Sequence, residues 1–168
     1  GNETIFLVFG DWMELSFGLS LLALGASAGV IGGAEIIGEL FAGWSVDRFG
    51  KRPVIITTGL LNALVCLLIP LTAGNLTAAL AAYFALFLMF EITVVGGVPL
   101  MTELVPSARS VVMSSILASG ALGRALGSWL GPFLFTQFGF SSNGVVSAII
   151  TAVATLVLAL WIREGREV

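Results

Sequence analysis

The sequence predicts an all-α protein, a bundle of transmembrane helices running up and down through a lipid bilayer. Two observations carry this prediction: hydrophobic residues make up 58% of the 168-residue chain, and charged residues only 10%. A soluble domain needs about a quarter of its residues charged to keep its surface wetted. The mean hydropathy of +1.08 therefore indicates an exterior that faces lipid. This length leaves room for about five or six spans of roughly 20 residues each.

Long apolar stretches divide the chain into one partial span and five full spans. The first stretch, about residues 1–15, is too short to cross a bilayer alone and begins as though partway along a helix. The fourth stretch is loosened near its end by Gly96, Gly97 and Pro99. The full spans are expected over about residues 19–45, 53–73, 76–101, 109–135 and 144–162.

The positive charges predict how these spans are oriented. Six of the seven basic residues fall on one side of the membrane if the spans alternate, and the opposite loops carry none. Cytoplasmic loops are enriched in Lys and Arg, so this side and the C-terminus are expected in the cytoplasm. The short loops favour a prokaryotic plasma (inner) membrane. The six residues are Arg48, Lys51, Arg52, Arg109, Arg163 and Arg166.

The tryptophans agree with these span ends. Each of the four lies near the end of a predicted span, where indole rings favour the boundary between lipid and water. We therefore expect them to act as anchors at the two membrane surfaces. They are Trp12, Trp44, Trp129 and Trp161.

The composition also excludes several classes of function. The chain contains no histidine and a single cysteine, Cys66, whose apolar surroundings are typical of a small buried side chain. Imidazole-based catalysis, disulfide frameworks and thiolate metal clusters are therefore excluded, and we expect no metal, no cofactor and no enzymatic activity. The net charge of −3, without any basic run, gives no reason to expect a nucleic-acid partner.

A few polar residues fall inside the predicted spans. A charge near the bilayer centre costs roughly 2.5–3.5 kcal/mol, so it needs a partner, a water-filled cavity or neutralisation. Ionisable residues occur in the first, second, fourth and fifth spans, whereas the third and sixth spans contain none. We expect the first four to surround a polar centre and the other two, interpreted as wholly apolar, to face lipid. The candidates for substrate binding and proton coupling are Asn2, Glu3, Glu35, Glu91 and Arg124.

Two other interpretations of these charges remain open. Arg124 and Glu91 could form a structural ion pair that joins two helices. Glu35 and Glu39 are spaced i, i+4 and share a helix face, where their repulsion would favour a proton on one of them. Glu39 is the weaker candidate of the two, because it lies one turn closer to the cytoplasmic loop.

Two glycine ridges indicate where helices approach closely. Glycines repeat every fourth residue in the second and fifth spans, and such small-residue ridges let helix backbones pack together in lipid. The ridges could serve packing inside the bundle or an interface at which two halves slide. They are Gly25, Gly29 and Gly33, and Gly123, Gly127 and Gly131.

Between the second and third spans the chain reads G-x-x-x-D-R-x-G-K-R. The second glycine permits a sharp turn, the aspartate offers a carboxylate to a helix N-terminus or an arginine, and the basic residues hold the loop at the anionic leaflet. A generic cytoplasmic loop would explain the basic residues but not the spacing of the others. The motif residues are Gly43, Asp47, Arg48, Gly50, Lys51 and Arg52.

This motif resembles the cytoplasmic signature loop of the major facilitator superfamily, which lies between helices 2 and 3 and, in weaker form, between helices 8 and 9. Three further stretches fit the C-terminal half of that family in order. Residues 17–20 resemble the outer loop between helices 7 and 8, residues 103–109 the loop between helices 10 and 11, and residues 120–132 helix 11. The resemblance implies that helices 7 and 10 line a cavity, helices 8 and 11 lie between the halves, and helices 9 and 12 are peripheral.

The resemblance also implies a missing partner. A whole member has twelve helices in two halves, with the substrate between them near the midplane. The chain would then be a fragment that starts within helix 7 and pairs with an N-terminal six-helix half. It would transport or export a small solute by alternating access, driven by protons. Glu3, Glu91 and Arg124 would line the cavity, Glu35 would assist coupling, and the signature loop would latch the cytoplasmic side.

The competing hypothesis is a non-transporting membrane scaffold that forms a homodimer through its glycine ridges. The signature loop argues against it, because a scaffold needs no gating latch. The reading frame upstream of Gly1 separates the two hypotheses. About six more spans with a second copy of the loop would indicate a half-transporter, and a start codon at this point would indicate a scaffold.

Overall fold

A computed structural model describes residues 1–104 and 106–162. Every regular element in these ranges is helical, and five of the helices are long and apolar enough to span a membrane. The predicted all-α bundle with five full spans and one partial span is confirmed. The helices are α1 (Asn2–Phe6), α2 (Phe9–Phe17), α3 (Leu21–Phe49), α4 (Lys51–Leu68), α5 (Leu76–Leu104), α6 (Arg109–Phe138) and α7 (Phe140–Trp161), with short 3-10 turns η1 (Ile69–Thr72) and η2 (Pro106–Ala108).

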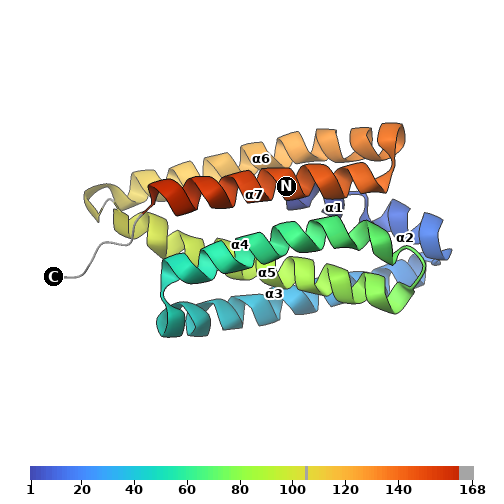
Figure 1. The fold of residues 1–168 in the computed structure, drawn as a ribbon, viewed down its shortest axis with the longest axis horizontal. Coiled ribbons are helices and arrows are strands. Elements are labelled where there is room, and N and C mark those ends of the chain that lie inside the picture. The colour runs from blue at the N-terminus through green and yellow to red at the C-terminus, as the bar shows by residue number, and fades with distance from the viewer. Residues whose placement is uncertain (105, 163–168) are drawn as a thin grey trace.

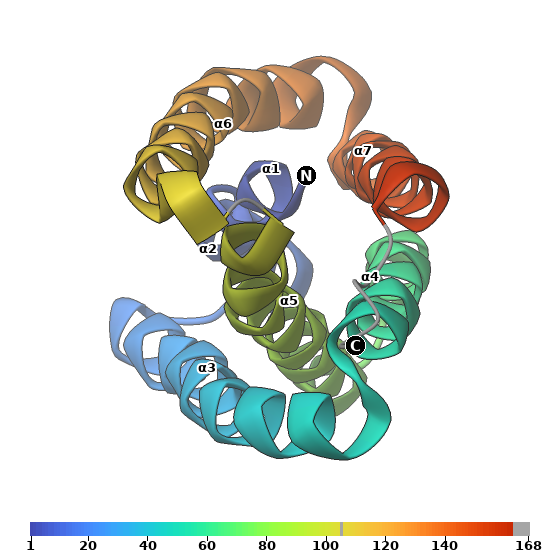
Figure 2. The ribbon, with the colours of Figure 1, turned by 90° about the vertical axis from the view of Figure 1, so that its left-hand side faces the viewer.

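The long helices run side by side along one axis (Figure 1). Seen end-on, α6, α7, α4 and α3 form an outer ring around α5 and the α1–α2 segment, and the ring is open between α3 and α6 (Figure 2). Helix α5 packs between α3 and α4, α4 also packs against α7, and α1 packs against α6 and α7. The apolar spans α4 and α7 belong to the same ring as the charged spans α3 and α6 (Figure 2).

The first span is broken, which the sequence did not predict. Instead of one helix over residues 1–15, α1 ends at Phe6 and α2 begins at Phe9. The Leu7 N–H still bonds to the carbonyl of Glu3, but in the described bonds none runs from the Val8 N–H to the carbonyl of Thr4. The helical ladder is interrupted at this point, in the middle of the partial span.

The signature motif forms a tighter turn than the predicted loop. Helix α3 continues through the motif to Phe49, and α4 begins at Lys51, so Gly50 alone separates them. Gly50 has φ 86° and ψ 151°, a conformation that side chains with a Cβ rarely adopt. The single glycine thus reverses the chain without leaving a stretch of unpaired backbone, and most of the motif is helical.

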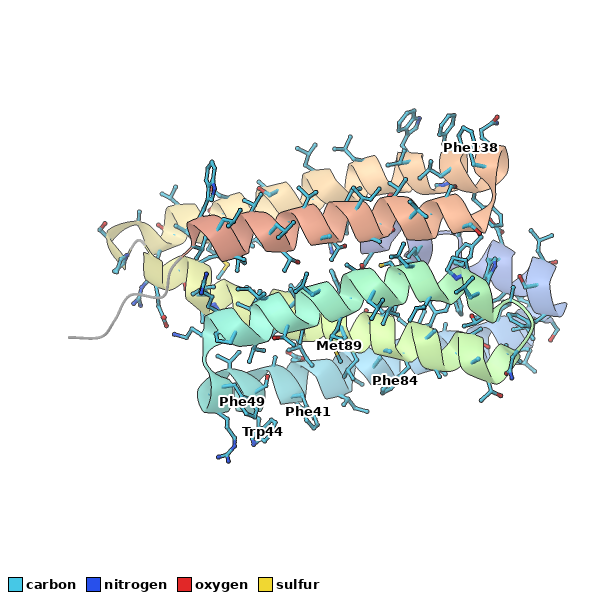
Figure 3. The ribbon with its side chains drawn as sticks, in the orientation of Figure 1. Phe41, Trp44, Phe49, Phe84, Met89 and Phe138 are labelled. Atoms are coloured by element: carbon cyan, nitrogen blue, oxygen red, sulfur yellow. The ribbon has the colours of Figure 1, made fainter. Side chains whose placement is uncertain are left out.

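Three of the four tryptophans are exposed, as a residue that anchors at a membrane surface would be, and Trp12 is buried. Trp44 points away from the bundle beside Phe41 (Figure 3), and Trp129 and Trp161 are exposed as well. Trp12 is only 4% exposed and stacks on Phe140, with ring centroids 4.3 Å apart. It belongs to the packed core of the bundle, because α2 buries its aromatic face against α5 and the start of α7.

Helices α4 and α7 expose apolar faces, as expected of spans that face lipid. However, the interpretation of both helices as wholly apolar is wrong, because each buries polar side chains on its inner face. The outward residues are Leu60, Leu61, Leu64, Leu67 and Leu68 on α4, and Val145, Ile149, Val153, Leu156 and Leu160 on α7. The inward polar residues are Thr58 and Asn62 on α4, and Asn143, Ser147 and Thr155 on α7.

Only one of the two predicted glycine ridges makes close contacts in the described bundle. On α6, a Cβ placed on Gly127 would lie 2.7 Å from the Cβ of Glu3, and one on Gly131 would lie 2.9 Å from the Thr4 carbonyl oxygen. These two glycines therefore admit α1 to the surface of α6. The ridge on α3 faces open space at Gly25, Gly29 and Gly33.

The basic residues gather at one end of the bundle. The α3–α4 turn, the start of α6 and the end of α7 all lie at the same end (Figure 1), which brings Arg48, Lys51, Arg52 and Arg109 together. Arg163 and Arg166 lie outside the described residues. That this end is cytoplasmic stays a prediction from the positive-inside rule.

Reporter fusions test the orientation. Green fluorescent protein fused after Val168 should fluoresce and alkaline phosphatase at that site should be inactive, because the basic end is retained in the cytoplasm. Fusions truncated at Gly139, between α6 and α7, should give the opposite pair of results. Phosphatase activity at Val168 together with fluorescence at Gly139 would reverse the predicted topology.

Candidate functional site

The backbones of α3 and α5 touch where Gly38 meets Glu91. Gly38 is buried, and a Cβ placed on it would lie 2.8 Å from the Cβ of Glu91 and 3.1 Å from the carbonyl oxygen of Leu88. Only a glycine fits between the two helices at this crossing. The contact directs the side chain of Glu91 onto α3 rather than towards Arg124.

This crossing gathers three carboxylates. Glu35 and Glu39 are one turn apart on α3, and the helical rotation of about 100° per residue puts them on the same side of Gly38. Both are exposed and Glu91 is half-buried. Both also interact electrostatically with Glu91. The structure therefore brings together two predicted site residues, Glu35 and Glu91, and includes Glu39, which the sequence ranked lower.

Glu3 and Arg124 belong to a different contact, between α1 and α6. Glu3 is half-buried with its Cβ against Gly127. Arg124 lies one helical turn from Gly127, on the face of α6 that packs on α1, and its side chain is exposed. Among the described residues Arg124 takes part in no ion pair. The structural pair of Arg124 with Glu91 is not formed.

Asn2 is directed away from its neighbour Glu3. It is buried against α4, where the Sγ of Cys66 lies 3.9 Å from its Oδ1, and its Nδ2 has no partner. Beside it lies a cavity of about 220 Å³ between α1, α4, α5 and α7, which Asn62 and Thr93 also line. The two candidates from the first span thus face different helices.

The sequence prediction missed a set of uncharged polar residues that fasten α1 in place. Asn143 donates to the carbonyl oxygens of Thr4, at 2.7 Å, and of Gly131, at 2.9 Å. Ser147 lies 2.5 Å from the Thr4 hydroxyl and donates to the Gly1 carbonyl at 2.8 Å. A repeat of polar residues every fourth position could have revealed this face of α7: Asn143, Ser147, Thr151 and Thr155.

The signature motif is held by contacts within the chain. Lys51 forms an ion pair with Glu103 near the end of α5. The Nε of Arg52 donates to the carbonyl of Ile162 at 2.8 Å, and its guanidinium also bonds Ala159 near the end of α7. The remaining charged motif residues, Asp47 and Arg48, are exposed, as is Gly43. The described residues contain no group of side chains suited to hold a metal ion.

Comparisons with known proteins agree with this architecture. The sequence profile described as Major Facilitator Superfamily matches residues 1–168. A protein of Mycobacterium tuberculosis (strain CDC 1551 / Oshkosh), named "Probable nitrate/nitrite transporter NarK2", is 27% identical over 126 residues, which are 74% of this chain and 32% of that protein. Its counterpart in strain ATCC 25618 / H37Rv matches to the same extent.

The alignment covers about a third of the length of these relatives. The profile match, in contrast, extends over all of the chain and includes the turn at Gly50 and the five long apolar helices. Proteins of this kind are multi-pass membrane transporters and not enzymes, in agreement with the resemblance seen in the sequence. On this match, the chain belongs to the Major Facilitator Superfamily.

Proposed function

We propose that the chain is the C-terminal half of a secondary transporter that moves a small solute by alternating access and couples this movement to protons. The observation that carries the proposal is the distribution of mid-span charge. Glu3, Glu35, Glu91 and Arg124 lie on α1, α3, α5 and α6, whereas α4 beyond Arg52 and α7 carry no acidic or basic residue. Charges inside a membrane mark a path for ions or substrate more often than they mark a structural role.

The partner in this proposal is an N-terminal six-helix half, which would cover the open side between α3 and α6. In the described bundle α6 buries only Gly127, Gly131 and Leu134. Much of its remaining surface is small or polar, which suits contact with protein better than contact with lipid. Its exposed small and polar residues include Ser114, Ser115, Ser119, Gly120, Gly123 and Ala125.

The carboxylates at the α3–α5 crossing support proton coupling. Neighbouring like charges in a medium of low dielectric constant repel one another, so a proton bound by one of them lowers the energy of the group. Glu91 is half-buried between helices, whereas Glu35 and Glu39 are exposed. A proton bound there would change the charge at a helix crossing, where it would bias one arrangement of the helices over another.

The solute class is proposed more broadly than the names of the relatives suggest. Those proteins are named for nitrate and nitrite, which are anions. The mid-span charges of this chain are mainly acidic, and Arg124 is the one basic residue among them. The names of the relatives make nitrate the first probe for transport. A lipophilic organic cation is the second probe, because the mid-span charges are mainly acidic.

Neutralising the charged candidates tests the proposed function. In the full-length protein reconstituted in proteoliposomes, Glu91→Gln and Arg124→Gln should each lower proton-driven uptake about tenfold or more, because they remove groups that act during transport. Glu14→Gln is the matched control, since Glu14 is an exposed carboxylate on α2 away from both contacts. Size-exclusion profiles check that each variant is folded.

Either of two results would contradict the proposal. Full uptake by both variants would remove Glu91 and Arg124 from the mechanism. An absence of proton-driven uptake of nitrate, of the organic cation and of a neutral sugar by the unmodified protein would favour the scaffold hypothesis.

Exchanging the charges of Lys51 and Glu103 tests the proposed cytoplasmic latch. Lys51→Glu and Glu103→Lys should each slow transport several-fold, and the double exchange should restore most of the rate, because it re-forms the ion pair. The free energy of unfolding should change by only about 1 kcal/mol or less, since both side chains are partly exposed. Transport that stays slow in the double variant would argue that the pair is not a latch.

A further inference from the structure

At the break between α1 and α2, the backbone carbonyl of Thr4 lacks its helical partner. In an α-helix the carbonyl of Thr4 would accept from the N–H of Val8, but this bond is absent in the described hydrogen bonds. The carbonyl accepts instead from the Nδ2 of Asn143 at 2.7 Å. An unpaired carbonyl at this depth in a membrane is costly, so the break persists only where a side chain takes over.

Asn143 joins three helices through one amide group. Its Nδ2 carries two N–H groups, and both are used, by the carbonyls of Thr4 on α1 and Gly131 on α6. Asn143 is 0% exposed, so water does not compete for these bonds. The approach depends on Gly131 as well, because a Cβ there would lie 2.9 Å from the same Thr4 oxygen.

The two sides of the break are fastened in different ways. On the α1 side, Ser147 bonds the hydroxyl of Thr4 and the carbonyl of Gly1, which fixes how α1 is turned about its axis. On the α2 side, aromatic packing replaces hydrogen bonds: Phe9 meets Tyr83 with ring centroids 4.8 Å apart, and Trp12 stacks on Phe140. The short link at Leu7 and Val8 lies between these two anchors.

The orientation of α1 decides where Glu3 lies. Glu3 precedes Thr4 directly, and with Thr4 turned towards α7, the side chain of Glu3 lies against Gly127 of α6. Gly127 is one turn from Arg124. We infer that Asn143 is a positioning residue: by holding the broken end of α1 it sets Glu3 on the α6 surface near Arg124. The role of Glu3 in transport rests on the proposed function, whereas its placement by Asn143 does not.

A cysteine cross-link tests the placement without any transport assay. In the full-length protein with Cys66→Ala, Glu3→Cys and Arg124→Cys should be joined by a short bifunctional thiol reagent; Gly127 itself is left in place, because a Cβ there would lie 2.7 Å from the Cβ of Glu3 and displace α1. Adding Asn143→Leu should lower the cross-linked fraction about tenfold at early times, the change expected for losing a buried hydrogen bond. The matched control is Asn62→Leu, because Asn62 is also buried but donates to the Leu86 carbonyl on α5 and not to a carbonyl of α1.

A second variant guards against a protein that fails to fold. Gly131→Ala pushes the Thr4 carbonyl from the α6 side and keeps Asn143, so it should reduce the cross-link as Asn143→Leu does. Equal cross-linking in the parent and in either variant, with the control also unchanged, overturns the inference. An equal loss in Asn62→Leu overturns it too, because the effect would then be general loosening.

The pH profile of uptake separates positioning from a purely structural role. If Asn143 acts through Glu3, Asn143→Leu should change the pH dependence of uptake in the same direction as Glu3→Gln. A lower rate with an unchanged pH profile contradicts that role in transport. Cross-linking that depends on Asn143 in a protein that transports nothing would refute the proposed function and leave the placement intact.

Discussion

The fold depends on one constraint: inside lipid, every backbone N–H and carbonyl must find its partner within the protein. Most of the chain meets this constraint with long helices, whose hydrogen bonds are internal. At the α3–α4 turn only one residue, Gly50, lies between the two helices, so little backbone is left outside a helix. At the break after α1 a side chain contributes, because Asn143 donates to the Thr4 carbonyl, which lacks its helical partner.

This constraint separates two kinds of polar residue in the bundle. Asn143, Ser147 and Asn62 are buried, are bound to backbone or hydroxyl groups of other helices, and hold those helices in register. The mid-span acids and Arg124 are exposed or half-buried, and none of them forms an ion pair in the described residues. Charged groups kept unpaired at this depth contribute little to the bundle's own stability, which favours a role in transport.

The sequence predicts the number of spans, their order and the end at which the basic residues gather, because these follow from composition and charge along the chain. It also predicts that Gly127 and Gly131 mark a helix contact. It does not predict which helix Glu91 meets, since that depends on Gly38, a glycine outside both ridges. Ionisable residues give no sign of the polar face of α7, because the polar repeat that begins at Asn143 carries no charge.

The proposed proton coupling and the binding of an anion, the kind of solute for which the relatives are named, require different charges in this half of the protein. An anion at the α3–α5 crossing would meet the carboxylates of Glu35, Glu39 and Glu91. Such a site could accept an anion only when protons have reduced its negative charge, or when basic residues of the proposed N-terminal half supply the attraction. A cation needs neither condition. Under the proposed coupling, the charge of the solute would decide whether protons and solute occupy these carboxylates together or in turn, and so whether they cross the membrane in the same direction or in opposite directions.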